Sequence, residues 1–198
     1  MSPLMVSTLL LLGVSYAYAY SAGAPESVCE DMLPKHPVDA QKSKMPYKIS
    51  VSKNQVKPGE PVEITISGKS FKGFFLQVRD DKGKPVGEFQ IPDNDKYAKT
   101  VNCQNSKATY PQPVMMIREF YCSLWQRFVR GQSCSLHEND KDGGTHNAAT
   151  HKNATDKKDF KLTWKAPGGA GKYTVYATVA EDGGTFWVKK PTEVISVA

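Results

Sequence analysis

Apolar and polar residues alternate with a period of two over most of this chain, which is the pattern of half-buried β-strands. Two early segments show the alternation, at Tyr47, Ile49 and Val51 and at Val62, Ile64 and Ile66. The Lys57-Pro58-Gly59-Glu60 sequence between them has the residue types of a tight turn. The alternation therefore predicts two short strands that are connected through this turn.

Similar segments continue to the C-terminus. Residues Phe74 to Val78 are almost continuously apolar and predict a central strand. Asp80-Asp81-Lys82-Gly83 predicts a turn into a partner strand that carries Val86 and Phe89. Later strands are predicted at Phe160 to Trp164, Tyr173 to Val179, Phe186 to Val188 and Val194 to Val197. About eight short strands with frequent turns predict an all-β fold, an antiparallel immunoglobulin-like β-sandwich.

Residues 113–130 depart from this pattern, because their apolar residues recur with a period of about 3.6. Arg118, Arg127 and Arg130 lie on one side of the helical projection, and Phe120 and Leu124 lie on the other. The segment therefore predicts a short basic amphipathic helix, which suits binding to anionic lipid or lipopolysaccharide. The alternative is that its apolar face packs on the sandwich and its arginines face water.

The first 19 residues have the pattern of a secretory signal peptide. Residues Leu4 to Val14 are almost continuously apolar, and Ala17-Tyr18-Ala19 is a small-x-small cleavage sequence. The apolar run is too short to span a bilayer, and no second apolar segment follows it. We therefore expect a secreted, extracellular protein without a transmembrane segment, whose mature domain covers residues 20–198.

Four cysteines lie in the predicted mature domain, at Cys29, Cys103, Cys122 and Cys134. An even number of cysteines in an oxidising compartment indicates two disulfides, for which three pairings are open. Because the chain has no C-x-x-C pair, these cysteines do not predict a zinc site.

The formal net charge is +6 at pH 7. A basic secreted protein tends to bind anionic partners such as sulfated glycans, lipid phosphates or teichoic acids, although the charge can also serve solubility alone. The lysines are spread along the chain and do not form the dense cluster that is typical of nucleic-acid binding.

The chain lacks the sequence motifs of hydrolytic and phosphate-binding sites, so we expect no catalysis and no cofactor. Its histidines, His36, His137, His146 and His151, fall in predicted loops and are expected to be ordinary surface residues. The loop from Glu138 to Gly143 partly resembles an EF-hand calcium loop, but Ala149 stands where a bidentate Glu is needed. We expect a solvated loop and no metal site.

Two further surface sites are predicted. Asn153-Ala154-Thr155 is an N-glycosylation sequon in a polar stretch. The alternation places Trp187 opposite Phe186 and Val188, so Trp187 is expected to be exposed. Lys189 and Lys190 follow it, and an exposed ring beside two lysines suits binding to an anionic glycan.

An ordered set of short motifs resembles the reeler domain family, and within it the small secreted insect defence proteins of the nodulation-mediating type. The motifs in chain order are GAP (23–25), Cys29, MPY (45–47), VKPGEPVEITISG (56–68), FKGFFLQVR (71–79), VGEF (86–89), TVNC (100–103), ATHKN (149–153), WKAP (164–167), YTVYATVA (173–180) and FWVK (186–189). Together they cover most of the predicted mature domain.

This resemblance implies an extracellular β-sandwich without catalytic residues, and a pairing of Cys29 with Cys103. It implies an antibacterial role in which the protein binds surface lipopolysaccharide, lipoteichoic acid or β-glucan and helps haemocytes to aggregate around bacteria. A second hypothesis is an extracellular matrix or adhesion component, because reeler domains also occur in large matrix proteins.

The sequence departs from the family pattern between the TVNC and ATHKN motifs, where residues 104–147 form an atypically long interval. It contains the predicted helix and both Cys122 and Cys134, which are a candidate second disulfide pair. Two explanations stay open. The helical period favours a lineage-specific insertion, and the abrupt interruption of the β pattern favours a gene-model error.

Overall fold

In a computed structural model of the chain, the described residues are 20–103 and 146–198. Several predictions lie outside them: the signal peptide, the helix at 113–130 with Arg118, Arg127 and Arg130, the pair Cys122 and Cys134, and the loop that follows Glu138. These stay predictions. Within the described residues, no helix is long and apolar enough to cross a membrane.

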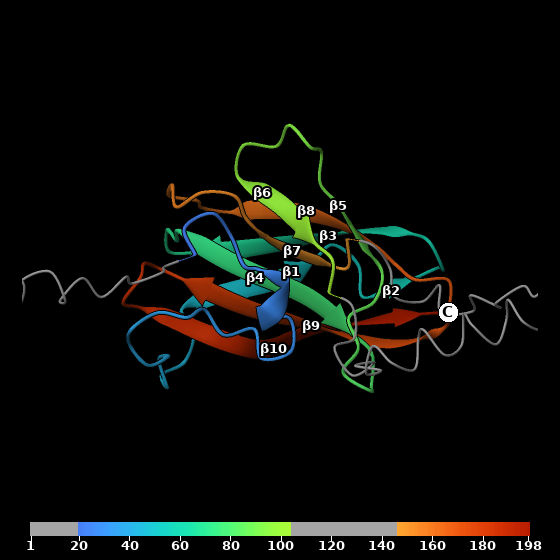
Figure 1. Ribbon diagram of the computed structural model, residues 1–198. Helices are drawn as coiled ribbons and strands as arrows, with labels where there is room; N and C mark the ends of the chain where they lie inside the picture. The colour runs from blue at the N-terminus through green and yellow to red at the C-terminus, as the bar shows by residue number, and fades with distance from the viewer. Residues whose placement is uncertain (1–19, 104–145) are drawn as a thin grey trace, which may run out of the picture.

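The described residues form two sheets and one short 3-10 helix, η1 (Figure 1). In chain order the elements are η1 (Glu26–Val28), β1 (Tyr47–Val51), β2 (Gln55–Val56), β3 (Pro61–Gly68), β4 (Gly73–Arg79), β5 (Glu88–Gln90), β6 (Ala98–Val101), β7 (Ala148–His151), β8 (Phe160–Lys165), β9 (Gly171–Ala180) and β10 (Phe186–Val197). One sheet has the order β1-β3-β8-β5, and the other has the order β2-β10-β9-β4-β7-β6. All neighbours are antiparallel except β2 and β10, which are parallel.

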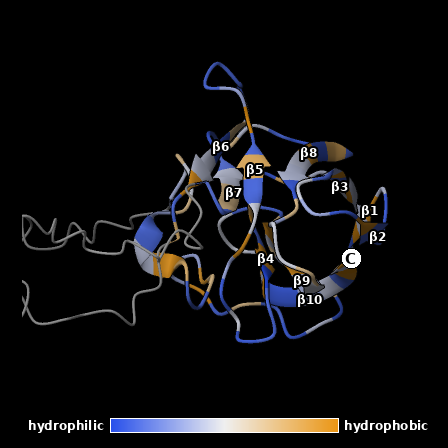
Figure 2. Cartoon of the chain, turned by 90° about the vertical axis from the view of Figure 1, so that its right-hand side faces the viewer, coloured by the Kyte–Doolittle hydropathy of each residue, from blue (hydrophilic) through white to orange (hydrophobic). Residues whose placement is uncertain are grey.

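The main core lies between the two sheets, because each sheet turns the apolar positions of its alternating strands inward. Val62, Ile64 and Ile66 of β3 are completely buried there. Trp164 of β8 is also completely buried, and its indole N–H donates to the carbonyl of Val86 at 3.0 Å. Figure 2 shows the six-stranded sheet curving from β10 through β4 to β6, with β5, β8, β3 and β1 completing the enclosure of this core. The predicted all-β sandwich is therefore confirmed.

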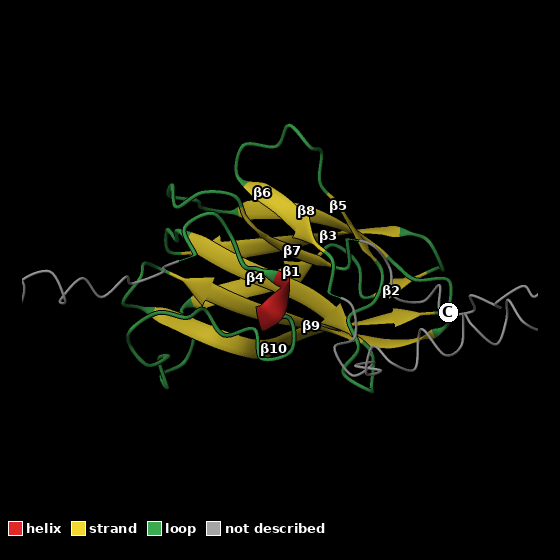
Figure 3. Cartoon of the chain, in the orientation of Figure 1, coloured by secondary structure: helices red, strands yellow, loops and turns green. Residues whose placement is uncertain are grey.

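The outer face of the six-stranded sheet is covered as well. Every residue of β4 is buried: Phe74, Leu76 and Val78 face the main core, whereas Phe75 lies in a second apolar cluster. The second cluster also contains Val28 and Met32, from the segment at residues 20–41. Figure 3 shows η1, the helical part of this segment, lying over the strands. The N-terminal part of the predicted mature domain therefore acts as a cover for the sheet.

Two details of the strand prediction are wrong. The predicted turn after β4 is confirmed, and the chain returns beside β4 as far as Val86, whose backbone N–H donates to the carbonyl of Val78 at 2.8 Å. The pairing with β4 ends there, because β5 pairs with β8 of the other sheet, with Phe89 opposite Trp164. Gly87 makes this crossing feasible: its φ is +70°, and a Cβ there would lie 2.5 Å from the Trp164 indole. The two strands predicted after residue 185 are one strand, β10, with register shifts between Trp187 and Lys190 and again before Val194.

Candidate functional site

A disulfide fixes the N-terminal segment to the outer face of the six-stranded sheet. It joins Cys29 to Cys103, the pair that the family resemblance implies, with their Cα atoms 5.5 Å apart. The side-chain amide of Gln77 donates to the carbonyl of Cys29 at 3.0 Å and to Sγ of Cys103 at 3.1 Å. Gln77 is completely buried, so these bonds satisfy an amide that has no access to water.

The buried guanidinium of Arg79 extends this attachment. Its Nη2 donates to the carbonyls of Cys29 at 2.6 Å and Glu30 at 3.0 Å, and its Nε donates to Oε1 of Gln77 at 2.7 Å. The guanidinium also lies 5.6 Å from the centroid of the Tyr176 ring. Burial lowers the pKa of Arg79, yet arginine remains protonated in proteins. The charge is therefore held by backbone carbonyls of the segment that it anchors.

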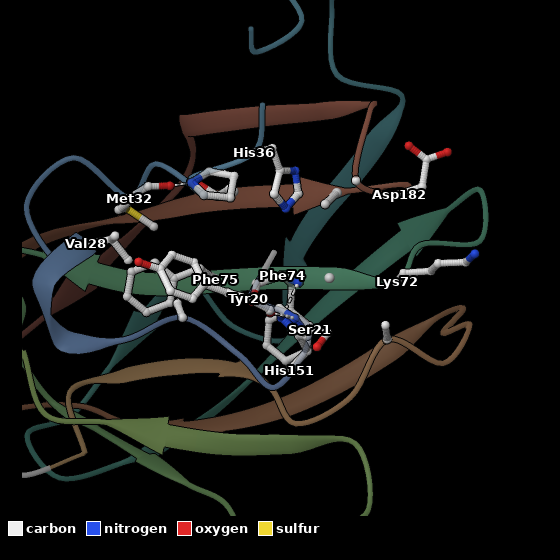
Figure 4. A pocket seen from close by; sticks show the side chains of 17 residues that line it. Tyr20, Ser21, Val28, Met32, His36, Lys72, Phe74, Phe75, His151 and Asp182 are labelled. Carbon is white, nitrogen blue, oxygen red and sulfur yellow. Dashed lines mark hydrogen bonds between the residues drawn. The ribbon is translucent and has the colours of Figure 1, made fainter. Parts of the chain in front are cut away.

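A cavity of about 130 Å³ lies between the N-terminal segment and strands β4, β7 and β9. Figure 4 shows that Val28, Met32 and Phe75 gather at one end, whereas Lys72 and Asp182 stand at the other. Apolar groups therefore line one end of the cavity, and one cation and one carboxylate lie at the opposite end.

Two histidines line this cavity, and neither is the ordinary surface residue that the sequence predicts. His151 is the last residue of β7 and is half-buried. Its Nε2 lies 3.0 Å from the carbonyl of Tyr20, and its Nδ1 lies 3.3 Å from the amide nitrogen of Phe74. A carbonyl only accepts, so Nε2 is placed to donate to Tyr20, whereas Nδ1 lies both near the Phe74 amide and 3.2 Å from the Phe74 carbonyl. Burial lowers the pKa of His151 and outweighs the hydrogen bonds to Phe74 and Tyr20, which raise it.

His36 comes from the N-terminal segment. Its ring packs edge-on against Phe186, with the ring centroids 4.8 Å apart. Its Nδ1 is buried, and among the residues that the structure describes none forms a hydrogen bond with it. Burial lowers the pKa of His36, and Asp182 opposes this effect. The cavity therefore contains a neutral imidazole whose buried nitrogen lacks a partner in the described part of the chain.

A different hollow lies at the end of the sandwich where the β4–β5 and β8–β9 loops meet. Its rim carries four lysines, at Lys82, Lys84, Lys165 and Lys172. Within residues 20–103 and 146–198, none of these four ammonium groups forms an ion pair. The hollow, here called the lysine groove, suits an anionic ligand because four lysines without an ion pair among the described residues line it.

The lysine groove also contains carboxylates, which limit its positive potential. The carboxylate of Asp80 already accepts two hydrogen bonds within its own turn, from the backbone N–H groups of Lys82 at 3.0 Å and Lys84 at 2.7 Å to its Oδ1. Oε1 of Glu88 lies 3.9 Å from Nδ1 of His146. Asp81 is exposed in the turn. The groove therefore has mixed charges with an excess of lysine.

The predicted exposure of Trp187 is wrong. Its ring is only 5% exposed, lies in the main core, and donates to the carbonyl of Ser43 at 3.1 Å. The alternation correctly places Phe186 on the opposite face, but the N-terminal segment covers that face through His36. Lys189 donates to the carbonyl of Glu30 at 2.8 Å, and Lys190 is half-buried. A ligand-binding role for these two lysines stays a prediction, now without an exposed ring beside them.

The sequon at Asn153 lies after β7, and its glycosylation stays a prediction. The side-chain amide of Asn153 donates to the carbonyl of Lys96 at 2.6 Å, and its Oδ1 accepts from the backbone N–H of Thr155 at 3.2 Å. Within the described part of the chain, no three His, Cys, Asp or Glu side chains gather in a way that could hold a metal ion.

Several known proteins are similar to this chain in sequence or in structure. The insect protein named "Putative defense protein Hdd11" from Hyphantria cunea is 35% identical, and the match covers 97% of this chain and 100% of that protein. "Ferric-chelate reductase 1" from Bos taurus is 31% identical over 95% of this chain, which spans only 26% of that protein. The human F-spondin reeler domain superposes with a TM-score of 0.50 at 14% identity, over 84% of this chain and 98% of that domain, which shows the fold alone.

The profile of the Reeler domain matches residues 27–111 and 132–198. The match is interrupted inside the interval at residues 104–147, where the sequence departs from the family pattern. The matched ranges contain all the strands described above and both cysteines of the disulfide. The chain therefore belongs to the reeler domain family.

Proposed function

We propose that this protein is a secreted innate-immunity protein that binds lipopolysaccharide or a related anionic glycan on bacterial surfaces and performs no catalysis. The observation that carries the proposal is the lysine groove. Support also comes from the insect relatives, which are named as defence proteins and match this chain over nearly its whole length.

The affinity in this proposal is electrostatic. Lys82, Lys165 and Lys172 are exposed, and Lys84 is half-buried. Exposed charge pairs contribute only about 0.2–1 kcal/mol each, so binding depends on several lysines acting together. Repeated phosphates or carboxylates on a bacterial surface would engage many copies of the protein at once, which increases retention without requiring a tight single site. Promotion of haemocyte aggregation would follow from such a coated surface.

The test is a pull-down of the mature protein with whole bacteria and, in parallel, with extracellular matrix. A groove variant changes Lys82, Lys84, Lys165 and Lys172 to Gln. A control variant changes four exposed lysines elsewhere, Lys42, Lys44, Lys69 and Lys158, to Gln and therefore has the same net charge.

We expect bacteria to retain the wild-type and control proteins, and to retain the groove variant at least about tenfold less. Equal losses for the two variants would show that net charge alone matters. Retention by matrix without retention by bacteria would overturn the proposed function in favour of adhesion.

A further inference from the structure

The cavity beneath the N-terminal segment has the features of a binding site for a small amphiphile. Val28, Met32 and Phe75 line one end, and Lys72 and Asp182 stand at the other (Figure 4). A ligand that suits this arrangement has an apolar tail for the first end and a polar head for the second.

The size of the cavity limits the tail. An apolar cavity of about 150 Å³ holds a benzene molecule, which has six carbon atoms. The cavity here measures about 130 Å³. It therefore accommodates a straight chain of about five or six carbon atoms, and a longer chain would have to extend into solvent.

The charges of Lys72 and Asp182 disfavour a head group that carries a single net charge. A carboxylate head would be attracted by Lys72 but repelled by Asp182. A cationic head would be attracted by Asp182 but repelled by Lys72. A hydroxyl group avoids both repulsions, and it both donates and accepts a hydrogen bond.

His36 provides a partner for such a hydroxyl once its ring rotates, because Nδ1 is shielded from any water-sized group in the present ring position. Its ring projects into the space beside Phe74 and His151 (Figure 4), and its Nδ1 is buried without a hydrogen bond to any residue in the described part of the chain. A buried polar atom without a partner is uncommon in folded proteins. A hydroxyl suits either neutral tautomer of His36, because it can donate to a bare nitrogen or accept from an N–H.

From these observations we infer that the cavity binds a short-chain aliphatic alcohol or another single-chain amphiphile that carries a hydroxyl, with its tail toward Met32 and Phe75. This site is separate from the lysine groove, and the inference does not rest on the proposed function. The nearby apolar side chains Leu33 and Val38, which are 42% and 45% exposed, flank Pro34 and His36 in the sequence and extend the apolar surface of this segment.

The experiment is isothermal titration calorimetry of the full mature protein with straight-chain alcohols from 1-propanol to 1-octanol. Each buried methylene contributes about 0.8 kcal/mol, which is about fourfold in affinity. We expect affinity to rise by about this factor per carbon up to about six carbons and then to level off. Absence of saturable heat, or a rise that continues without levelling, would overturn the inference.

Two variants locate the site. Ala180→Leu fills the cavity from β9 and should lower the affinity for 1-hexanol at least about tenfold. Ala170→Leu makes the same change at an exposed position of the β8–β9 loop and should leave it unchanged. Equal affinities in the two variants would place the alcohol elsewhere.

His36→Phe tests the role of the hydroxyl, because it keeps an aromatic ring against Phe186 and removes Nδ1. It should abolish the preference for 1-hexanol over 1-chloropentane, which lacks a hydroxyl. An unchanged preference would exclude His36 as the partner. The chain-length series on the unmodified protein remains decisive even where a variant folds poorly.

Discussion

Removal of the Cys29–Cys103 disulfide should destabilise the whole domain, since it crosslinks residues that are 74 positions apart. Closing a loop of this length removes conformational entropy from the unfolded chain that corresponds to about 4 kcal/mol. The free energy of unfolding of a domain is about 5–15 kcal/mol, so the loss is a large fraction of the total. A loss of about 4 kcal/mol equals about a thousandfold change in the ratio of folded to unfolded protein.

The assay compares chemical unfolding of the wild-type protein and a Cys29→Ala/Cys103→Ala variant by circular dichroism without reducing agent. We expect the free energy of unfolding to fall by about 4 kcal/mol. For a domain of this size the Tm should fall by about 2–4 °C for each kcal/mol. A second variant, Cys29→Val/Cys103→Val, restores most of the side-chain volume and should lose a similar amount, because the loss comes from the missing crosslink.

A loss below about 1 kcal/mol in both variants would refute this reasoning. It would mean that the hydrogen bonds of Gln77 and Arg79 to the carbonyl of Cys29 hold the N-terminal segment without the covalent bond. Hydrogen exchange of the segment would then stay slow in the uncrosslinked protein, whereas our account expects it to become fast.

Two further predictions concern buried groups. Lys157 is only 4% exposed, and its ammonium donates to the carbonyls of Lys72, Asn153 and Thr155, at 3.0, 2.8 and 2.8 Å. Lys157→Met leaves these acceptors without that donor and should lower the free energy of unfolding in urea by at least about 2 kcal/mol. An unchanged midpoint would show that water replaces the ammonium freely. Burial lowers the pKa of His36 and His151 below the ordinary value of 6.5, so the unfolded chain binds protons that the folded chain does not. The free energy of unfolding should therefore fall as the pH drops below about 6.5. A His36→Phe/His151→Gln variant should show a flatter pH profile between about pH 7 and pH 5, and parallel profiles would contradict this origin.

The alternation of apolar residues predicts most of the sandwich, because a strand with one buried face has an apolar residue at every second position. It fails at Trp187 because the sheet there is covered on both faces, and a period of two does not show which face is the inner one. It also fails at β5, where the chain crosses to the other sheet at Gly87. Turn residues show that the chain reverses there, but not which strand comes next in space.

The candidate sites were harder to predict than the fold. The turn at Asp80 and the turn at Ala166 are both evident in the sequence, and lysines accompany each. Their meeting in one groove follows only from the order of β4, β5, β8 and β9 in the two sheets. The cavity depends on how residues 20–36 cross the outer face, and no periodic pattern in that segment predicts its path. The disulfide implied by the family resemblance provides the one sequence-based indication that this segment lies near Cys103.

The most direct test of the proposed function is the affinity of the mature protein for lipopolysaccharide, measured by surface binding at about 0.1 M and about 1 M salt, where the Debye length is about 10 Å and about 3 Å. The proposal predicts clear binding at the lower salt concentration, a loss of at least about tenfold at the higher one, and little salt dependence in the variant with the four groove lysines changed to Gln. Equally tight binding at both salt concentrations, or the same salt dependence in the groove variant and the wild-type protein, would contradict it.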